Sequence, residues 1–528
     1  MKQKTFPVEK SDLIALILTL GSLFLVSRIG ILGGFNIGFS IGGILAFSIG
    51  FIYVFKKKAD SKVFGVLLYI LTVALLLSFS LTNDNVIKFC TLVFLAFLSV
   101  FLLCSVSDNV SLKNGTYMSF INTATITVER VFEGLLITGK SYIEKITKNK
   151  SKNIVYIIIG VVISVVLLCI VLPLLSSSDI AFGSLVESLF KNGALLVAAL
   201  IITLAMLPGI YSFMFSLRKQ SREDSKKVKT IGKIPNVLFN IVLSAVSVVY
   251  CVYAVSQLAY ITKAFAFLLP EDFTAAQFAR SGFFQMGAIS FINFALLAIT
   301  AMLVKRTGKK IPVSTKSLLA FLCLFTMFYI STAIIKMLKY ISLYGLTHLR
   351  VLTSVFMLML AAIFFVMLLR VFIPKIKYAK AVVVICAMSL LCVSLVDTKT
   401  VIAEYNYTQY KEGKIQIDVE QIGSLGVSGI PTLVKLSEDE DKKVSDDAIR
   451  ELMYVTEKVY TNAFDKEPDE EFTLKKDSFY QYNLSWLRAK KAIDEGVDMT
   501  MDYEAFNEYY YNEYLNEETT TEAYEEVF

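Results

Sequence analysis

The sequence is poor in the residues on which most enzymes and most soluble domains depend. Its 528 residues include one histidine and one tryptophan, and only 18% of the residues are charged. A soluble domain has about 25% charged residues, so a chain this apolar needs lipid around much of its length. A single histidine leaves no Ser–His–Asp or Cys–His set outside the apolar segments, and we predict no catalytic residues and no cofactor.

Cysteine is also used sparingly, and only in apolar surroundings. The chain has seven cysteines, no C-x-x-C pattern, and no cysteine after Cys392, in the region where disulfides would form on an outer face. This distribution argues against a disulfide scaffold and against a zinc site. We expect the thiols to behave as small apolar side chains. They are Cys90, Cys104, Cys169, Cys251, Cys323, Cys386 and Cys392.

Long apolar runs take the place of these missing features. A helix rises about 1.5 Å per residue, so about 20 apolar residues cross a hydrocarbon layer of about 30 Å. Eleven runs predict such spans, and the fold class is therefore all-α. We expect a polytopic transmembrane bundle of about 11 helices with a small helical extracytoplasmic C-terminal domain. The predicted spans are 13–29, 35–55, 63–81, 89–106, 154–175, 194–217, 237–261, 283–304, 318–338, 351–369 and 381–396.

The distribution of charge predicts the orientation of these spans. Lys and Arg alternate from loop to loop: the N-terminus and the even-numbered connections hold 30, and the odd-numbered ones hold 8. The positive-inside rule then places the N-terminus in the cytoplasm, and eleven crossings place the C-terminal domain outside a cell (plasma) membrane. Because these positive charges lie in short loops between apolar runs, we expect no nucleic-acid partner.

Residues 398–528 differ sharply from the rest in charge. They hold 14 Lys and Arg against 30 Asp and Glu, whereas residues 1–397 hold 38 against 15. Such an asymmetry indicates a domain boundary. Within the acidic region we predict a helix from Ser445, as its N-cap, to Phe464, and another from Asp477 to Asp494 with Gly496 as its stop.

The predicted regions of the whole chain are four helices in 1–106, an interfacial loop in 107–153, a seven-helix core in 154–397, a helical domain in 398–501 and an acidic disordered tail in 502–528.

The loop at 107–153 carries a helical pattern of apolar residues followed by lysines. We predict a helix on the inner leaflet, held there by apolar burial and by attraction to anionic lipid. Gly134 to Ser141 also match the phosphate-loop pattern G-x-x-x-x-G-K-[ST], but a helical pattern precedes them, so we interpret the match as coincidental. The apolar residues are Ile121, Ala124, Val128, Val131, Leu135, Tyr142 and Ile146, and the lysines are Lys140, Lys145, Lys148, Lys150 and Lys152.

Polar residues inside the predicted spans allow two interpretations. Pro208-Gly209 interrupts the sixth span, and broken helices line the substrate sites of transporters. Asn240, Gln285 and Asn293 are typical of hydrogen bonds between neighbouring helices. The spans hold almost no charge at mid-depth, which argues against ion-coupled transport.

Four stretches taken together resemble a known family. They are residues 278–285, 345–351, 402–406 and 429–433, and they include Arg280, His348, Arg350 and Asn406. Their order and spacing, over roughly residues 150–440, resemble a family of bacterial polytopic membrane proteins that is catalogued as a domain of unknown function. Where Ser281 stands, the family often has an acidic residue, so no carboxylate role is carried over to this position. The resemblance implies a fold and a location, and no activity.

All four stretches fall at the predicted outer face, which suggests a candidate site there. A guanidinium group holds a phosphate or carboxylate with two hydrogen bonds, so Arg280 and Arg350 would bind an anionic headgroup. Alternatively, they would pair with acidic residues such as Asp397 and latch the C-terminal domain to the helices. A third interpretation is that they only anchor helix ends. The residues of this candidate outer-face anion or latch site are Arg280, Arg350, His348, Tyr344, Thr347 and Asp397.

These observations favour a non-enzymatic envelope protein, either a sensor or an assembly and interaction protein with a ligand or partner site on the outer face. The alternatives are a membrane transporter and an enzyme that acts on a lipid-linked substrate at the outer leaflet. The expected partners are the lipid bilayer and either an anionic lipid headgroup or an envelope protein.

Overall fold

The computed structural model describes two compact units that interleave along the chain. The first consists of Met1–Leu343, Leu349–Val396 and Asp477–Asn483, and the second of Tyr344–His348, Asp397–Lys476 and Leu484–Phe528. We call them the helical unit and the C-terminal unit and describe each by itself. The described residues are 5–56, 62–110, 117–148, 194–220, 234–261, 283–305, 311–460 and 483–496, with Gly160, Ile163, Leu167 and Val171.

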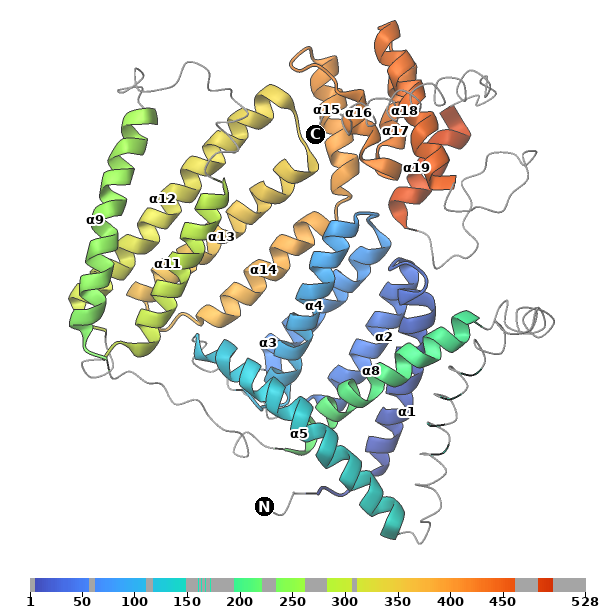
Figure 1. Ribbon diagram of the computed structural model, residues 1–528, viewed down its shortest axis with the longest axis vertical. Helices are drawn as coiled ribbons and strands as arrows, with labels where there is room; N and C mark the ends of the chain where they lie inside the picture. The colour runs from blue at the N-terminus through green and yellow to red at the C-terminus, as the bar shows by residue number, and fades with distance from the viewer. Residues whose placement is uncertain are drawn as a thin grey trace, which may run out of the picture. The chain divides into compact units, whose positions relative to one another are not determined.

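The helical unit is built from long apolar helices (Figure 1). Among the described residues, nine helices are long and apolar enough to cross a membrane, or ten if α14 and the following α15 count as one span. The predicted all-α class is confirmed, and the protein is a multi-pass membrane protein. Apart from Gly160, Ile163, Leu167 and Val171, the predicted span 154–175 lies outside the described residues. The helices are α1 (Lys10–Leu25), α2 (Ile37–Val54), α3 (Lys62–Leu77), α4 (Asn85–Val106), α5 (Met118–Lys148), α8 (Ala194–Lys219), α9 (Asn236–Ile261), α11 (Phe283–Leu303), α12 (Val313–Tyr344), α13 (His348–Phe372) and α14 (Tyr378–Ser394).

Two hydrophobic clusters form the core of the helical unit, and α14 belongs to both. Helices α1 to α4 form the first cluster together with parts of α5 and α8, and α14 contributes Val383, Ala387 and Leu391 to it. Helices α9, α11, α12 and α13 form the second, to which α14 contributes Tyr378. Figure 1 shows α14 between the two groups of helices.

Asparagines join the helices of the second cluster. The buried Asn293 of α11 donates to the Thr326 hydroxyl of α12 at 2.9 Å and accepts from the Tyr250 hydroxyl of α9 at 2.8 Å. Asn240 of α9 bonds the hydroxyls of Ser314 and Thr315 at 2.9 and 2.7 Å. The predicted interhelical hydrogen bonds are therefore confirmed for Asn240 and Asn293. They fix the register of neighbouring helices, because apolar contacts alone distinguish poorly between alternative registers.

The Pro208-Gly209 pair does not interrupt its helix. Helix α8 continues from Ala194 to Lys219 with Pro208 in its interior, so the predicted break is wrong. Membrane helices tolerate an interior proline, because neighbouring groups and local adjustment satisfy the freed carbonyl group.

Helix α5 packs closely against α8, and a glycine makes this approach possible. A Cβ atom on Gly134 would lie 3.0 Å from the Ser212 carbonyl oxygen and 3.1 Å from the Ser216 Cβ, whereas a Cβ on Gly139 would meet nothing within 4 Å. Both glycines lie in the middle of a regular helix. The phosphate-loop pattern is thus part of a helix, as the coincidental interpretation expects, and its first glycine has a packing role.

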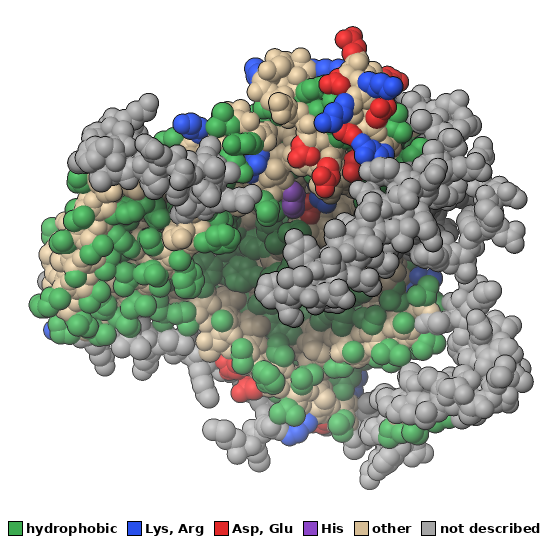
Figure 2. All heavy atoms as spheres, turned by 45° about the horizontal axis from the view of Figure 1, so that its top comes forward, with side chains coloured by type: hydrophobic (Ala, Val, Ile, Leu, Met, Phe, Trp, Pro, Cys, Tyr) green, Lys and Arg blue, Asp and Glu red, His purple; other side chains and the backbone are tan. Residues whose placement is uncertain are grey.

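The C-terminal unit is a small assembly of shorter helices. Its core is formed by buried residues such as Ile402, Leu433 and Trp486. Figure 2 shows charged side chains gathered on this unit and hydrophobic side chains covering the helical unit. The elements are α15 (Thr398–Lys411), α16 (Val419–Gly423), the 3₁₀ turn η5 (Gly426–Ser428), α17 (Ile430–Ser437), α18 (Lys442–Tyr460) and α19 (Leu484–Gly496).

The predicted helices of this unit are present with altered starts. Helix α18 begins at Lys442, and the Asp441 carboxylate accepts from the Lys443 amide at 3.0 Å. Ser445 lies inside the helix and donates to the Ser437 carbonyl at 2.6 Å, so its assignment as N-cap is wrong. Helix α19 ends at Gly496, the predicted stop. Residues 461–482 and the predicted tail 502–528 lie outside the described residues.

The two glycines of α5 provide a matched test of this packing. Gly134→Leu forces a side chain against the backbone of α8, and we expect it to lower the free energy of unfolding by about 1–3 kcal/mol. Gly139→Leu removes a glycine from an open helix position, and we expect a gain of up to about 1 kcal/mol. Thermal unfolding of both variants in detergent measures the difference. Equal effects at the two positions would contradict the packing role of Gly134.

Candidate functional site

The loop between α12 and α13 is bound by an asparagine of the C-terminal unit. The Leu346 amide donates to Asn406 Oδ1 at 2.7 Å, and Asn406 Nδ2 donates to the Leu346 carbonyl at 2.8 Å. Asn406, which is 3% exposed, therefore bonds both backbone polar groups of Leu346, as a residue of a neighbouring β-strand would. We call this pair of hydrogen bonds the Asn406 clamp.

Two further residues shape the clamp. Gly345 has φ +71°, a conformation that favours glycine, and a Cβ there would lie 2.6 Å from Asn406 Oδ1. Gln421 of α16 donates a second hydrogen bond to the Leu346 carbonyl at 2.8 Å. The recurrent residues Gly345 and Asn406 of the resembling stretches thus belong to one structural feature, in which a residue of α15 and one of α16 hold a single loop residue.

Asp397 connects two elements inside the C-terminal unit. Its buried carboxylate caps α15 and accepts from the Thr400 hydroxyl at 2.6 Å. The Ser428 hydroxyl of η5 lies 3.2 Å from both carboxylate oxygens. These bonds join the start of α15 to η5 at the point where the chain enters the unit.

The predicted outer-face residues are divided between the two units. Tyr344, Thr347 and His348 belong to the C-terminal unit, whereas Arg350 belongs to the helical unit. The Arg350 guanidinium carbon lies 4.0 Å from the centre of the Tyr340 ring, one helix earlier, in the geometry of a cation–π contact. Arg280 lies outside the described residues, so a site shared by Arg280 and Arg350 stays a prediction.

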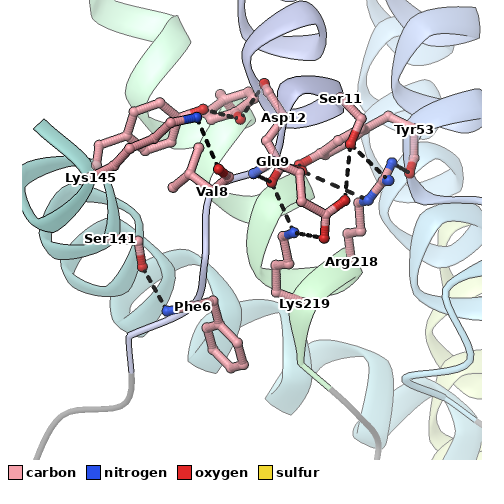
Figure 3. A network of polar contacts seen from close by, with 12 residues as sticks. Phe6, Val8, Glu9, Ser11, Asp12, Tyr53, Ser141, Lys145, Arg218 and Lys219 are labelled. Carbon is pink, nitrogen blue, oxygen red and sulfur yellow. Dashed lines mark hydrogen bonds and ion pairs between the residues drawn. The ribbon is translucent and has the colours of Figure 1, made fainter. Parts of the chain in front are cut away.

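A buried ionic network in the helical unit lies around Asp12, at the start of α1 (Figure 3). The Asp12 side chain is 0% exposed and lies 2.9 Å from Lys219 Nζ and 3.8 Å from Arg218 Nε. The Tyr53 hydroxyl donates to it at 2.9 Å, and the Glu9 amide donates at 2.8 Å. The start of α1 and the ends of α2 and α8 therefore meet at one carboxylate.

Helix ends explain why opposite charges collect there. Asp12 lies in the first turn of α1 and forms a capping box with Glu9, while Arg218 and Lys219 lie in the last turn of α8. Carboxylates are favoured at helix N-termini and cations at C-termini. The hydrogen bond from Lys219 also lowers the pKa of Glu9, which keeps this second carboxylate charged.

The network extends to α5 through the first residues of the chain. The Phe6 amide donates to the Ser141 hydroxyl at 3.0 Å, and Lys145 Nζ donates to the Val8 carbonyl at 2.9 Å. The Tyr142 and Tyr211 hydroxyls are 2.6 Å apart, and that of Tyr211 donates to the Asp12 carbonyl at 2.8 Å. The N-terminal segment is thus fixed to α5, which places α5 at the end of the bundle where α1 begins.

Sequence reasoning missed this network, although it left a signal. Asp12 is an acidic residue at the start of an apolar run, and Arg218 and Lys219 are adjacent cations at the end of another. Both observations fit the positive-inside pattern, and their pairing depends on which helices are neighbours. Only the packing of α1 against α8 brings the three residues together.

A cluster of asparagines occupies the opposite end of α2 and α4. Asn483 Nδ2 donates to Asn83 Oδ1 at 2.9 Å and lies 3.3 Å from Asn36 Oδ1. Lys88 Nζ donates to the same Asn36 oxygen at 2.7 Å. Asn483, although late in the chain, belongs to the helical unit, and α19 of the C-terminal unit begins at the next residue.

Neither set of polar residues resembles a metal centre. Over the described ranges, no three His, Cys, Asp or Glu residues are grouped so that they would hold a metal ion. The chemistry that these residues offer is hydrogen bonding and ion pairing between separate segments of the chain.

Asp12 should dominate the stability of its network. Asp12→Asn preserves the shape and removes the charge. The Lys219 ammonium then loses its buried counter-ion and keeps the exposed carboxylate of Glu9, and we expect a loss of about 2 kcal/mol. The double variant Asp12→Asn, Lys219→Met should recover part of that loss. Glu9→Gln, at an exposed carboxylate, is the control and should have a smaller effect. Thermal unfolding in detergent would contradict the account if Asp12→Asn resembled Glu9→Gln.

Comparison with known proteins supports the family that the sequence resembles. A family described as Domain of unknown function (DUF4153) matches residues 41–436, which extend from within α2 to near the end of α17. No curated protein and no solved structure matches the chain. The match extends towards the N-terminus beyond the stretches that carry the resemblance, and it covers well over half of the chain. The chain therefore belongs to this DUF4153 family of unknown function.

Proposed function

We propose that the protein is a non-enzymatic envelope sensor or interaction protein, in which the C-terminal unit passes a binding event to α12 and α13. The Asn406 clamp is the observation that carries this proposal. The loop that it holds has only three residues between α12 and α13. A displacement of Leu346 would therefore move the adjoining ends of α12 and α13.

The clamp suits a coupling role because its strength is moderate. A hydrogen bond contributes about 0.5–1.5 kcal/mol net, and more is lost when a buried partner is left unsatisfied. Leu346 forms three such hydrogen bonds, two with Asn406 and one with Gln421. Their total contribution to the free energy of the clamped state is therefore small enough for the binding of a ligand to offset. A ligand shifts such an equilibrium by its difference in affinity for the two states.

The number of crossings and the loop charge support an outer location for the C-terminal unit. Asn36 precedes α2 and Asn83 precedes α4, so both lie where helical hairpins turn, at the opposite end of α1 from Lys10. Asn483 bonds both residues and so lies at the same end of the helical unit. Nine described helices qualify as spans, or ten if α14 and α15 count as one. With the second count, the predicted span 154–175 would give eleven crossings, and the distribution of Lys and Arg orients the N-terminus inwards.

The charge of the C-terminal region favours a protein partner. Residues 398–528 hold 30 acidic against 14 basic residues, and such a surface repels anionic headgroups and attracts a basic surface. An envelope protein with a basic face is therefore the preferred partner. The transporter alternative is favoured by the many spans and by a break at Pro208-Gly209, and the continuous α8 removes the second of these supports.

Reporter fusions test the orientation. A fusion after Glu438 should report an outer location, and a fusion at the N-terminus should report the cytoplasm. A cytoplasmic signal at Glu438 would refute the proposed orientation and the outer-face function together.

Trp486 allows the coupling itself to be measured. It is the single tryptophan and is buried in the C-terminal unit, so its emission follows the unfolding of that unit. A bimane group on Leu349→Cys, in a cysteine-free background, reports on the start of α13, where Leu349 is exposed. In the otherwise wild-type chain, we expect both signals to change at one temperature.

Asn406→Ala should lower the free energy of unfolding of the C-terminal unit by about 2 kcal/mol. The Trp486 signal should then change at a lower temperature than the bimane signal. Thr408→Ala, which removes a hydroxyl that donates to the Glu404 carbonyl within α15, is the matched control and should leave the two transitions together. If the transitions remain coincident in Asn406→Ala, the clamp does not couple the two units.

A further inference from the structure

Helix α5 exposes a row of large apolar side chains along one side. Phe132 is 68% exposed, and the row includes Val128, Leu135, Leu136 and Ile143. Residues three or four positions apart lie on the same side of a helix, so these five form one continuous face. We call it the apolar face of α5.

The opposite side of α5 is occupied by the bundle. Ile126, Arg130, Gly134 and Ile137 are buried, and Gly134 brings the helix against α8. Between the two sides runs a narrow strip with exposed charges, formed by Glu133, Lys140 and Glu144. A helix with one side on protein, one apolar side uncovered and a polar strip between them is arranged as an interfacial helix would be.

We propose that the apolar face of α5 lies among the acyl chains of the leaflet on the N-terminal side, and that its C-terminal end attracts anionic headgroups. The inference is independent of the proposed function, because α5 belongs to the helical unit and the Asn406 clamp lies in the C-terminal unit. The face of α5 that it assigns to lipid differs from the face predicted from the sequence. Val131 and Tyr142 of the predicted stripe pack against the core, so the lipid face is centred closer to Phe132.

The position of α5 identifies the leaflet. Ser141 and Lys145 bond Phe6 and Val8, which hold α5 at the end of the bundle where α1 begins. Helix α5 has 31 residues, of which seven are charged, and it is not among the candidate spans of the described chain. It therefore lies along the membrane surface.

Charge favours anionic lipid over a second copy of this chain as the occupant. From position 140 to its end at Lys148, α5 has three lysines and one acidic residue, Glu144. Each basic residue near an anionic leaflet contributes attraction, whereas two copies meeting through this end would bring like charges together. The apolar and basic features thus fit one partner, a phospholipid leaflet that contains anionic headgroups.

Tryptophan quenching tests the proposal in the full-length protein. Phe132→Trp is introduced in a Trp486→Phe background, and the protein is placed in phosphatidylcholine–phosphatidylglycerol vesicles with or without brominated acyl chains. We expect bromine to reduce the emission about twofold or more, because the apolar face of an interfacial helix enters the acyl boundary by about 5–10 Å. Leu136→Trp serves in the same way if Phe132→Trp does not fold.

Two control positions calibrate this measurement. Val248→Trp, on an exposed side of the span α9, should be quenched and confirms reconstitution. Glu133→Trp, the next residue on the polar strip, should be quenched much less than Phe132→Trp. In vesicles of phosphatidylcholine alone, quenching should weaken at Phe132→Trp and remain unchanged at Val248→Trp.

Three results would overturn the proposal. Emission at Phe132→Trp that is blue-shifted and unquenched would mean that protein, such as a second copy, covers the face. Emission that is red-shifted and unquenched would mean that water covers it. Quenching at Phe132→Trp that is independent of phosphatidylglycerol would show that anionic headgroups do not hold α5 in the leaflet.

Discussion

The two hydrogen bonds between Asn406 and Leu346 are the interaction on which the account of the C-terminal unit depends. A buried backbone N–H and C=O must find partners, and in this loop a side chain supplies both. The loop therefore belongs to the C-terminal unit, although its two ends continue into α12 and α13. Because Gly345 adopts a positive φ and leaves no space for a Cβ, the loop conformation and the clamp require one another.

Within the helical unit, the region where α1 begins is held by charge. Asp12 gathers the start of α1 and the cations at the end of α8, where helix dipoles favour both signs. The N-terminal segment then connects this network to α5. The helical unit is thus fixed by ionic contacts at one end and by the asparagine cluster of Asn36, Asn83 and Asn483 at the other.

Much of the fold was predictable from the sequence, because hydropathy and loop charge act locally. The spans, the helical character of α5 and the bonds of Asn240 and Asn293 follow from such patterns. The Asp12 network and the clamp depend on contacts between distant segments, which one sequence does not specify. Ser445 was misassigned because Asp441 offers an earlier cap, and Pro208 because a membrane helix tolerates proline.

Hydrogen–deuterium exchange resolved at the Leu346 amide tests the central claim most directly. The account predicts slow exchange in the full-length wild-type protein, because the amide is bonded to a buried side chain and opens only when the clamp opens. Asn406→Ala should raise the exchange rate at Leu346 while amides in the middle of α12 remain protected. Exchange of Leu346 at the rate of an unstructured peptide in the wild type, or an unchanged rate in Asn406→Ala, would contradict the account.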